Sequence, residues 1–214
     1  GAEQAPGRDA FIIRPADPTR PLDPATCFDA GKPLEVDVGC GKGRFLVARA
    51  AENPDVNFLG IDRLLVRLRK ASKKVGRLGL CNVRLLRLEA AYAVRYLLPT
   101  AGVRVFYVFF PDPWPKRKHQ RRRLFTKAFL DDICRCLVPG GRLHVATDHL
   151  SYFRQIRDLV VDDPRFFEID TFAPPPSQQT DFELGFVEMG ATIGRASFCK
   201  REPVDAAASG RREP

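Results

Sequence analysis

Four acidic residues stand in or directly after short apolar runs, where a row of carboxylates could bind a ligand. Asp37 lies in LEVDV, Asp62 ends FLGID, Glu89 follows VRLLRL and Asp112 follows VRVFYVFF by one proline. Ligands of open α/β sheets bind outside the carboxyl ends of the strands. If the four runs are parallel strands, their acids gather at one edge of the sheet, and this edge is the predicted ligand site.

A glycine-rich turn follows the first of these runs. Gly39, Gly41 and Gly43 form the pattern G-x-G-x-G directly before a helical segment. Glycines permit a tight turn and a close approach of the backbone to a ligand, and a helix amino terminus favours a negative group. The pattern alone is weak, but Asp62 stands about 20 residues further on, where an acid hydrogen-bonds ribose hydroxyls. Asp62 and Glu89 could equally cap the helices that follow them.

The segment PDPW, residues 111–114, ends the fourth run. Two prolines restrict the backbone around Asp112, so that an acid and an aromatic ring form a rigid rim suited to a flat substrate. The alternative interpretation is a proline-rich turn that ends a buried strand.

A basic run, PKRKHQRRR, follows directly. So much like charge repels itself unless a polyanion such as a nucleic-acid backbone balances it, and a net charge of +9 agrees with such a partner. A second basic stripe runs from Arg63 to Arg77 at helical spacing and is either a further contact of this kind or an ordinary solvated face. The residues expected to contact the nucleic-acid backbone are Lys118, His119, Gln120, Arg121, Arg122 and Arg123.

Short β-rich runs alternate with helical patterns along the chain, which indicates βαβ units and a parallel sheet. Strands are predicted at 34–38, 57–61, 83–88, 103–110, 142–147, 166–172 and 193–200. Helices are predicted at 43–52, 64–78, 90–97, 123–137, 149–161 and 181–189. The predicted fold is a Rossmann-like α/β domain with a seven-stranded, mostly parallel sheet and helices on both faces.

Length and composition favour one domain. With 214 residues, 44% of them apolar, the chain can bury one good core. We expect an irregular arm over 1–32, a single domain over 33–202 and a flexible tail over 203–214. The six cysteines show no C-x-x-C pairing, so zinc and disulfide frameworks are not expected. No apolar run is long enough to span a bilayer and no signal region is visible, which predicts a cytoplasmic protein without a membrane partner.

Taken together, EVDVGCGKGRF, FLGID, FFPDPWPKRKHQRRR, the ATD at 146–148 and T-x-F-E at 180–183 resemble the bacterial tRNA (guanine-N7-)-methyltransferase family. The motifs also come in the family's order, and the resemblance covers about residues 33–200. It implies a class I methyltransferase fold and methyl transfer from S-adenosylmethionine, leaving S-adenosylhomocysteine, to N7 of the variable-loop guanosine, position 46 in standard tRNA numbering. It implies no metal, and family members act as monomers or homodimers.

The resemblance also implies roles for single residues. Asp112 is the catalytic candidate. On the cofactor side the resemblance places Asp37, Gly39, Gly41, Gly43, Asp62, Arg63, Glu89, Ala90 and again Asp112, with Asp37 and the glycines toward methionine, Asp62 toward ribose, and Glu89 and Ala90 toward adenine. On the substrate side it places Lys116, His119, Arg122, Asp148, Thr180, Asp181, Phe182 and Glu183. The family usually has Glu at the place of Asp37 and Asp or Asn at the place of Glu89, so each carboxylate's reach differs by one methylene.

Guanine N7 has an available lone pair, so its methylation needs no proton removed first. The protein therefore has to align the methyl donor with the guanine and to stabilise the charge that develops. Asp148 and Glu183 could accept hydrogen bonds from guanine N1–H and its 2-amino group. Both could also be helix-capping residues, since Thr180 and Glu183 match a capping box. The enzyme alternative is methylation of an exocyclic base amine, and the alternative from another class is a catalytically silent tRNA-binding module. A nicotinamide dehydrogenase is disfavoured by the glycine spacing.

Overall fold

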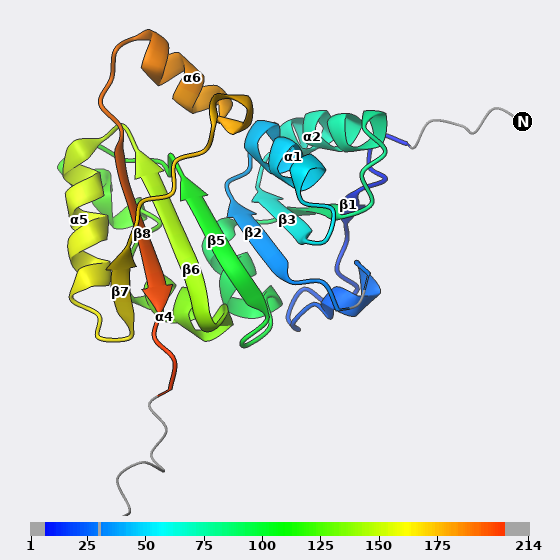
Figure 1. Ribbon diagram of the computed structural model, residues 1–214, viewed down its shortest axis with the longest axis horizontal. Coiled ribbons are helices and arrows are strands. Elements are labelled where there is room, and N and C mark those ends of the chain that lie inside the picture. Colours follow the sequence, from blue (N-terminus) through cyan, green and yellow to red (C-terminus); the bar gives the residue numbers. More distant parts are fainter. Residues whose placement is uncertain (1–6, 30, 204–214) are drawn as a thin grey trace, which may run out of the picture.

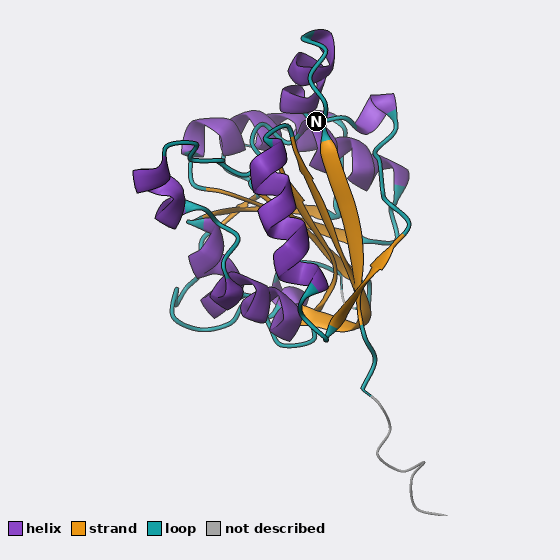
Figure 2. Ribbon diagram, turned by 90° about the vertical axis from the view of Figure 1, so that its left-hand side faces the viewer, coloured by secondary structure: helices purple, strands orange, loops and turns teal. Residues whose placement is uncertain are grey.

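The computed structural model describes residues 7–29 and 31–203 and contains one twisted eight-stranded sheet. The strand order is β1-β4-β3-β2-β5-β6-β8-β7. All pairings are parallel except those of β8, which runs antiparallel to both β6 and β7. Helices cover both faces of the sheet, as the two orthogonal views show (Figures 1 and 2). The predicted Rossmann-like α/β class is confirmed.

The strands that form the sheet are β1 (Ile12–Ile13), β2 (Leu34–Val38), β3 (Asn57–Asp62), β4 (Val83–Arg87), β5 (Val103–Phe109), β6 (Leu137–Thr147), β7 (Phe166–Ile169) and β8 (Gly194–Lys200). Every residue of β2 and β3 is buried, because helices cover both faces of these central parallel strands. This burial explains why their sequences are continuous apolar runs broken only by a few polar residues.

The α-helices are α1 (Arg44–Glu52), α2 (Leu65–Arg77), α3 (Ala90–Tyr92), α4 (Lys127–Cys136), α5 (Leu150–Val161) and α6 (Asp181–Glu188). Shorter helical turns are η1 (Pro24–Thr26), the π-type η2 (Ala93–Leu97), η3 (Arg117–Arg122) and η4 (Pro176–Gln178). Helices α1 and α2 bury apolar residues against one face of the sheet, while η2, α4 and α5 contribute to the larger core on the other. None of the helices in the described ranges is long and apolar enough to cross a membrane.

Several elements differ from the predicted ones, and four of these differences are described here. The eighth strand, β1, comes from the short apolar island in the amino-terminal arm, where Ile12 and Ile13 pair with β4. Strand β6 begins at Leu137 instead of 142 because it includes the VPGG segment. Strand β7 ends at Ile169 instead of 172. Helix α4 begins at Lys127 instead of 123, because the Thr126 hydroxyl caps it by accepting a hydrogen bond from the Phe129 N–H.

The sheet reverses its winding at β2, which has β3 on one side and β5 on the other. Ligands of such sheets bind at this switch point, outside the carboxyl ends of the two strands. The glycine turn follows β2, and the PDPW segment follows β5. The topology therefore brings together two motifs that stand about seventy residues apart in the chain.

Gly60 in β3 allows α1 to lie close to the sheet. An added Cβ would stand 2.5 Å from Leu46 Cδ2 and 2.8 Å from Cys40 Sγ, and both of these side chains are buried. We expect Gly60→Ala to lower the free energy of unfolding by about 1–3 kcal/mol through overpacking. Thermal or denaturant unfolding measures the change. Gly185→Ala in α6 is the control, since nothing lies within 4 Å of its added Cβ. Equal stability of the two variants would contradict this packing account.

Candidate active site

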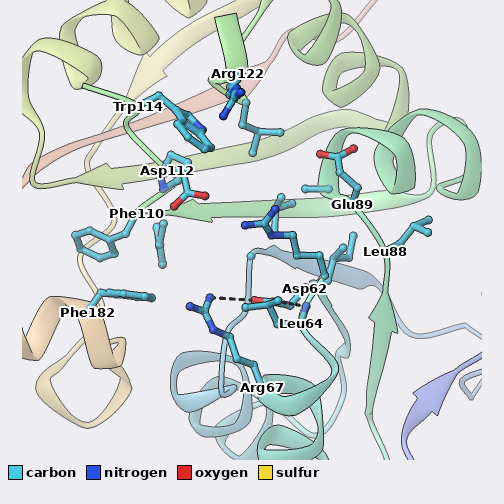
Figure 3. Close-up of a pocket in the computed structure, with 18 residues that line it drawn as sticks. Asp62, Leu64, Arg67, Leu88, Glu89, Phe110, Asp112, Trp114, Arg122 and Phe182 are labelled. Atoms are coloured by element: carbon cyan, nitrogen blue, oxygen red, sulfur yellow. Dashed lines mark hydrogen bonds and ion pairs between the residues drawn. The ribbon is translucent and has the colours of Figure 1, made fainter. Parts of the chain in front are cut away.

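A cavity of about 490 Å³ opens at the carboxyl edge of β2, β3, β4 and β5. It contains the predicted cofactor-side residues Gly39, Asp62, Arg63, Glu89, Ala90 and Asp112 in its lining. A second cavity of about 290 Å³ adjoins it and is lined by Asp37, Gly41 and the α6 start, among others. The two cavities share Gly39, Arg67, Phe109 and Phe182. Figure 3 shows Asp112 and Trp114 on one side of the larger cavity, with Asp62 and Arg67 on the other.

The glycine turn has the conformation that its sequence requires. Gly39, Gly41 and Gly43 have φ values of 81°, 55° and 70°, in the left-handed region that only glycine adopts without strain. A Cβ added to Gly39 or to Gly41 would meet nothing within 4 Å, so the backbone of both residues borders open space. At Gly43 a Cβ would stand 2.7 Å from the Ala71 Cβ of α2, so this glycine serves helix packing.

Asp62 holds the glycine turn and the start of α2 together. Its carboxylate accepts hydrogen bonds from the Gly41 N–H at 3.1 Å and from the Leu64 N–H at 2.8 Å. Arg67 Nη1 lies 3.8 Å from Asp62 Oδ2. Asp62 is thus buried and bonded to its own chain while lining the cavity.

Asp37 is buried near Asp62, and no ion pair compensates it among the described residues. Burial, and secondly the charge of Asp62, raise the pKa of Asp37 to about 8. A cationic group in the adjoining cavity would lower this pKa again. The pair of acids therefore forms a site that favours positive charge.

Glu89 caps the following helix, which is one of the two roles considered from the sequence. Its carboxylate caps α3, accepting from the Ala91 N–H at 3.0 Å and the Tyr92 N–H at 2.8 Å. It also lines the larger cavity with Ala90. Since both oxygens already bind backbone amides, contact with a ligand at Glu89 uses the remaining lone pairs.

Asp112 lies between two strained residues. Phe110 and Trp114 have φ values of 53° and 41°, a region in which residues with large side chains are rare. Strain of this kind costs about 1–3 kcal/mol per residue and concentrates at functional sites. All three residues line the larger cavity, and Asp112 itself is exposed there. The prolines and the two left-handed residues restrict the backbone on both sides of Asp112.

The basic segment folds as η3 beside Trp114. The Arg122 guanidinium stands 5.0 Å from the centre of the Trp114 ring. The His119 ring packs edge-on against the Trp114 ring, with 5.9 Å between the two ring centres. Arg122 lines the larger cavity, whereas Lys116, Lys118, His119, Gln120 and Arg121 lie outside its lining. Lys116, Lys118, Gln120 and Arg121 are exposed. This arrangement leaves a row of basic groups next to the cavity mouth.

Arg123 departs from the prediction that it contacts RNA. Only 7% of its surface is exposed. Its guanidinium donates to the Pro113 carbonyl at 2.7 Å and to Gln155 Oε1 at 2.5 Å, and it stands over the Tyr152 ring. Arg123 therefore anchors the PDPW segment to α5 and faces away from solvent.

Helix α6 reaches the cavities because a long loop attaches it to α1. Arg44 Nε donates to the Gln179 carbonyl at 3.0 Å, and Gln178 Nε2 donates to Glu52 Oε2 at 2.6 Å. The Thr180 hydroxyl caps α6 by accepting from the Glu183 N–H at 3.0 Å. Thr180, Asp181 and Phe182, predicted as substrate-side residues, line the smaller cavity together with Asp37 and Gly41.

Glu183 and Asp148 lie differently from the prediction that they read a guanine edge. Glu183 is 2% exposed, lines neither cavity and forms an ion pair with Arg195 at the start of β8. Asp148 is half-buried and also lies outside both linings. The helix after Asp148 is capped by His149, whose Nδ1 accepts from the Tyr152 N–H at 3.3 Å.

Sequence reasoning missed two arginines that contact predicted substrate-side residues. Arg67 borders both cavities and stands 6.0 Å from the Phe182 ring, although its place in a basic stripe suggested only a surface role. Arg195 is separated from Glu183 by a loop, and the sequence contains no signal of that pairing.

The chain matches the model of a family described as "Putative methyltransferase" over residues 31–196, which include every strand that borders the cavities. A tRNA (guanine-N(7)-)-methyltransferase of Rubrobacter xylanophilus is 38% identical over 174 residues, which cover 78% of this chain and 77% of that protein. This chain belongs to the tRNA (guanine-N7-)-methyltransferase family. A member from Halorhodospira halophila is 37% identical, over 78% of this chain and 74% of its own.

Solved structures place this methyltransferase family member in a wider fold group. The 16S rRNA methyltransferase KamB aligns with a TM-score of 0.57 at 18% identity, covering 80% of this chain and 89% of that one. The antibiotic-resistance methyltransferase Kmr aligns with a TM-score of 0.56 at 17% identity, over 82% and 90% of the two chains. At these identities the likeness shows the class I methyltransferase fold.

The raised pKa of Asp37 predicts a pH-dependent stability. An acid with a raised folded-state pKa favours the folded state most at low pH, and this contribution is lost as pH rises from 3.8, the unfolded value, through about 8. We expect Asp37→Asn to melt at a higher temperature than the parent, with a difference that grows up to about pH 8 and then levels off. Melting curves between pH 5 and 9 measure it. Asp55→Asn, at an exposed turn, is the control and should show no such growth.

The ion pair of buried Glu183 and half-buried Arg195 predicts strong coupling. Removal of either partner leaves an uncompensated buried charge, so Glu183→Leu and Arg195→Met should each cost about 3–5 kcal/mol of stability. The double variant should recover most of this loss because neither charge remains. A double-mutant cycle by denaturant unfolding measures the coupling. Additive losses would show that the pair does not act as a unit.

Proposed function

We propose that this chain transfers a methyl group from S-adenosylmethionine to N7 of the variable-loop guanosine, position 46 in standard tRNA numbering. The observation that carries the proposal is the position of Asp112, on a strained turn across the cavity from the glycine turn and Asp62. The family relatives named as tRNA (guanine-N(7)-)-methyltransferases support the same reaction.

The two adjoining cavities fit S-adenosylmethionine. The open space above Gly39 and Gly41 admits a close ligand, and the Asp37 side favours its cationic methionine end. Asp62 and Glu89 line the larger cavity, where their free lone pairs suit ribose hydroxyls and the adenine amine. When bound, S-adenosylmethionine supplies a methyl group carried on a positively charged sulfur.

Asp112 aligns the guanine and tempers the positive charge that develops on the ring as N7 is methylated. The guanine N7 lone pair is available at neutral pH, so no general base is needed and the rate depends on positioning and charge. The prolines and strained residues around Asp112 restrict the backbone of this turn before the substrate arrives. No reorganisation of the turn then adds to the barrier.

Aromatic side chains provide flat surfaces on which the guanine can stack. Phe182 is 50% exposed, lines both cavities and lies below Phe110 in the view of Figure 3, while Trp114 lies above Asp112. Unstacked bases of single-stranded RNA segments commonly stack on such rings. The exposed basic groups of η3 lie beside Trp114 and balance the phosphates around the target nucleotide.

Replacement of Asp112 tests this assignment. We expect Asp112→Ala to lower kcat/KM for methyl transfer to tRNA by at least about 100-fold and Asp112→Asn by at least about tenfold, because electrostatic groups at reacting centres contribute this much. Transfer of labelled methyl to tRNA transcripts measures the rates, with Asp170→Asn at an exposed turn as the control. Near-normal rates in both variants would remove Asp112 from the reaction.

Product analysis tests the target atom. Labelled methyl should appear only in transcripts that carry the variable-loop guanosine, and chemical scission specific for 7-methylguanosine should cut there. Methylated RNA without such scission would favour an exocyclic amine instead. Binding of tRNA without binding of S-adenosylmethionine would favour a silent RNA-binding module.

A further inference from the structure

The outer face of α2 carries a dense positive charge. Residues Leu65–Arg77 contain six basic side chains and no acidic one. The helix buries Leu68, Ala71 and Val75 in the core, so its basic residues lie on the opposite and flanking faces. We call the exposed basic residues of this helix, Arg69, Lys70, Lys73 and Arg77, the α2 basic face.

Little of this charge is balanced within the described part of the chain. Arg69 pairs with Asp9 of the amino-terminal arm at 2.8 Å and 3.2 Å. Within residues 7–29 and 31–203, no acidic group lies within 4.0 Å of Lys70, Lys73 or Arg77. Neighbouring Lys74 has a lowered pKa, first because of burial and also because of the charges of Arg44, Lys42 and Arg77, although Asp181 opposes the shift. The surface thus has an excess of positive charge.

The α2 basic face is also hollowed. A cleft of about 950 Å³ runs between the arm and the helix, with Leu65, Val66 and Ser72 among its lining residues. Its basic lining residues are Arg8, Arg69, Lys70, Lys73 and Arg77. A groove with five cations around it suits a polyanionic strand better than a flat charged face does.

The α2 basic face is continuous with the active site. Arg63, Leu64 and Arg67, at and before the first turn of α2, line the larger cavity, and Arg122 of the η3 segment lines its other side (Figure 3). Helix α2 has 13 residues, which corresponds to a length of about 20 Å away from the cavity. Basic groups therefore stand on two sides of the place where the target base is methylated.

We propose that the α2 basic face is a second binding surface for the tRNA backbone, which holds the stretch of RNA that leaves the cavity on the side opposite η3. This inference rests on the proposed function. The occupant is the phosphate backbone, because the cations recur every three to four residues without acidic groups between them and lead directly from the cavity. Lys70, Lys73 and Arg77 contribute to affinity and leave the chemical step unchanged.

Neutral replacement of these three residues tests the proposal. For the full-length chain carrying Lys70→Gln, Lys73→Gln and Arg77→Gln, we expect KM for tRNA to rise about tenfold or more with kcat within twofold of the parent. The slope of log affinity against log salt should become shallower by about 2–3, since each lost phosphate contact reduces it by roughly 0.7–0.9. The dissociation constant for S-adenosylmethionine should stay unchanged.

A triple variant with the same charge change elsewhere is the matched control. Arg95→Gln, Arg142→Gln and Arg201→Gln replace exposed arginines outside both cavity linings, and this variant should keep the parent's KM and salt slope. If the α2 variant also keeps both values while the parent methylates tRNA, the proposal is overturned. Absence of N7 methylation by the parent would instead overturn the proposed function, so the two failures are distinguishable.

Discussion

The active-site edge depends on the hydrogen bonds of one buried carboxylate. Asp62 binds the Gly41 N–H of the loop after β2 and the Leu64 N–H before α2, so it fixes two loops that come from neighbouring strands. Loops with three left-handed glycines have high conformational entropy when unrestrained. The charge that fixes the loop also raises the cost of ionising Asp37 nearby, and a cationic ligand relieves this cost. Loop geometry and ligand preference therefore have the same origin.

The second constraint is the strained turn after β5. Phe110 and Trp114 hold left-handed conformations, and Arg123 secures the turn through its bond to the Pro113 carbonyl. The fold can maintain the strain because Phe110 is also tied to β6 by the bond from its N–H to the Ala146 carbonyl at 2.7 Å. Arg123 of the basic run thus stabilises the turn, while its neighbours Arg121 and Arg122 remain exposed and available to a polyanion.

Local patterns predicted much of this fold and part of this site. Continuous apolar runs located the central strands, and the glycine turn, Asp62 and Asp112 could be placed because sheet topology brings strand ends together. Contacts that depend on distant packing were beyond such reasoning. The burial of Arg123 and the pairing of Glu183 with Arg195 follow from how α5, α6 and β8 pack, and no local pattern encodes them. The two-residue strand β1 was too short to separate from an irregular arm.

The attachment of α6 to α1 links the two halves of the reaction. The loop that leads into α6 is bonded through Gln179 and Gln178 to Arg44 and Glu52 of the helix that follows the glycine turn. A ligand that restrains α1 would therefore also restrain the start of α6, which lines the cavity for the other ligand. Linkage requires that such an effect be reciprocal, so that each substrate changes the affinity for the other by the same factor. The 174–180 loop thus connects the helix after the glycine turn to the cavity-lining start of α6, so any coupling between two bound ligands would pass through these two hydrogen bonds.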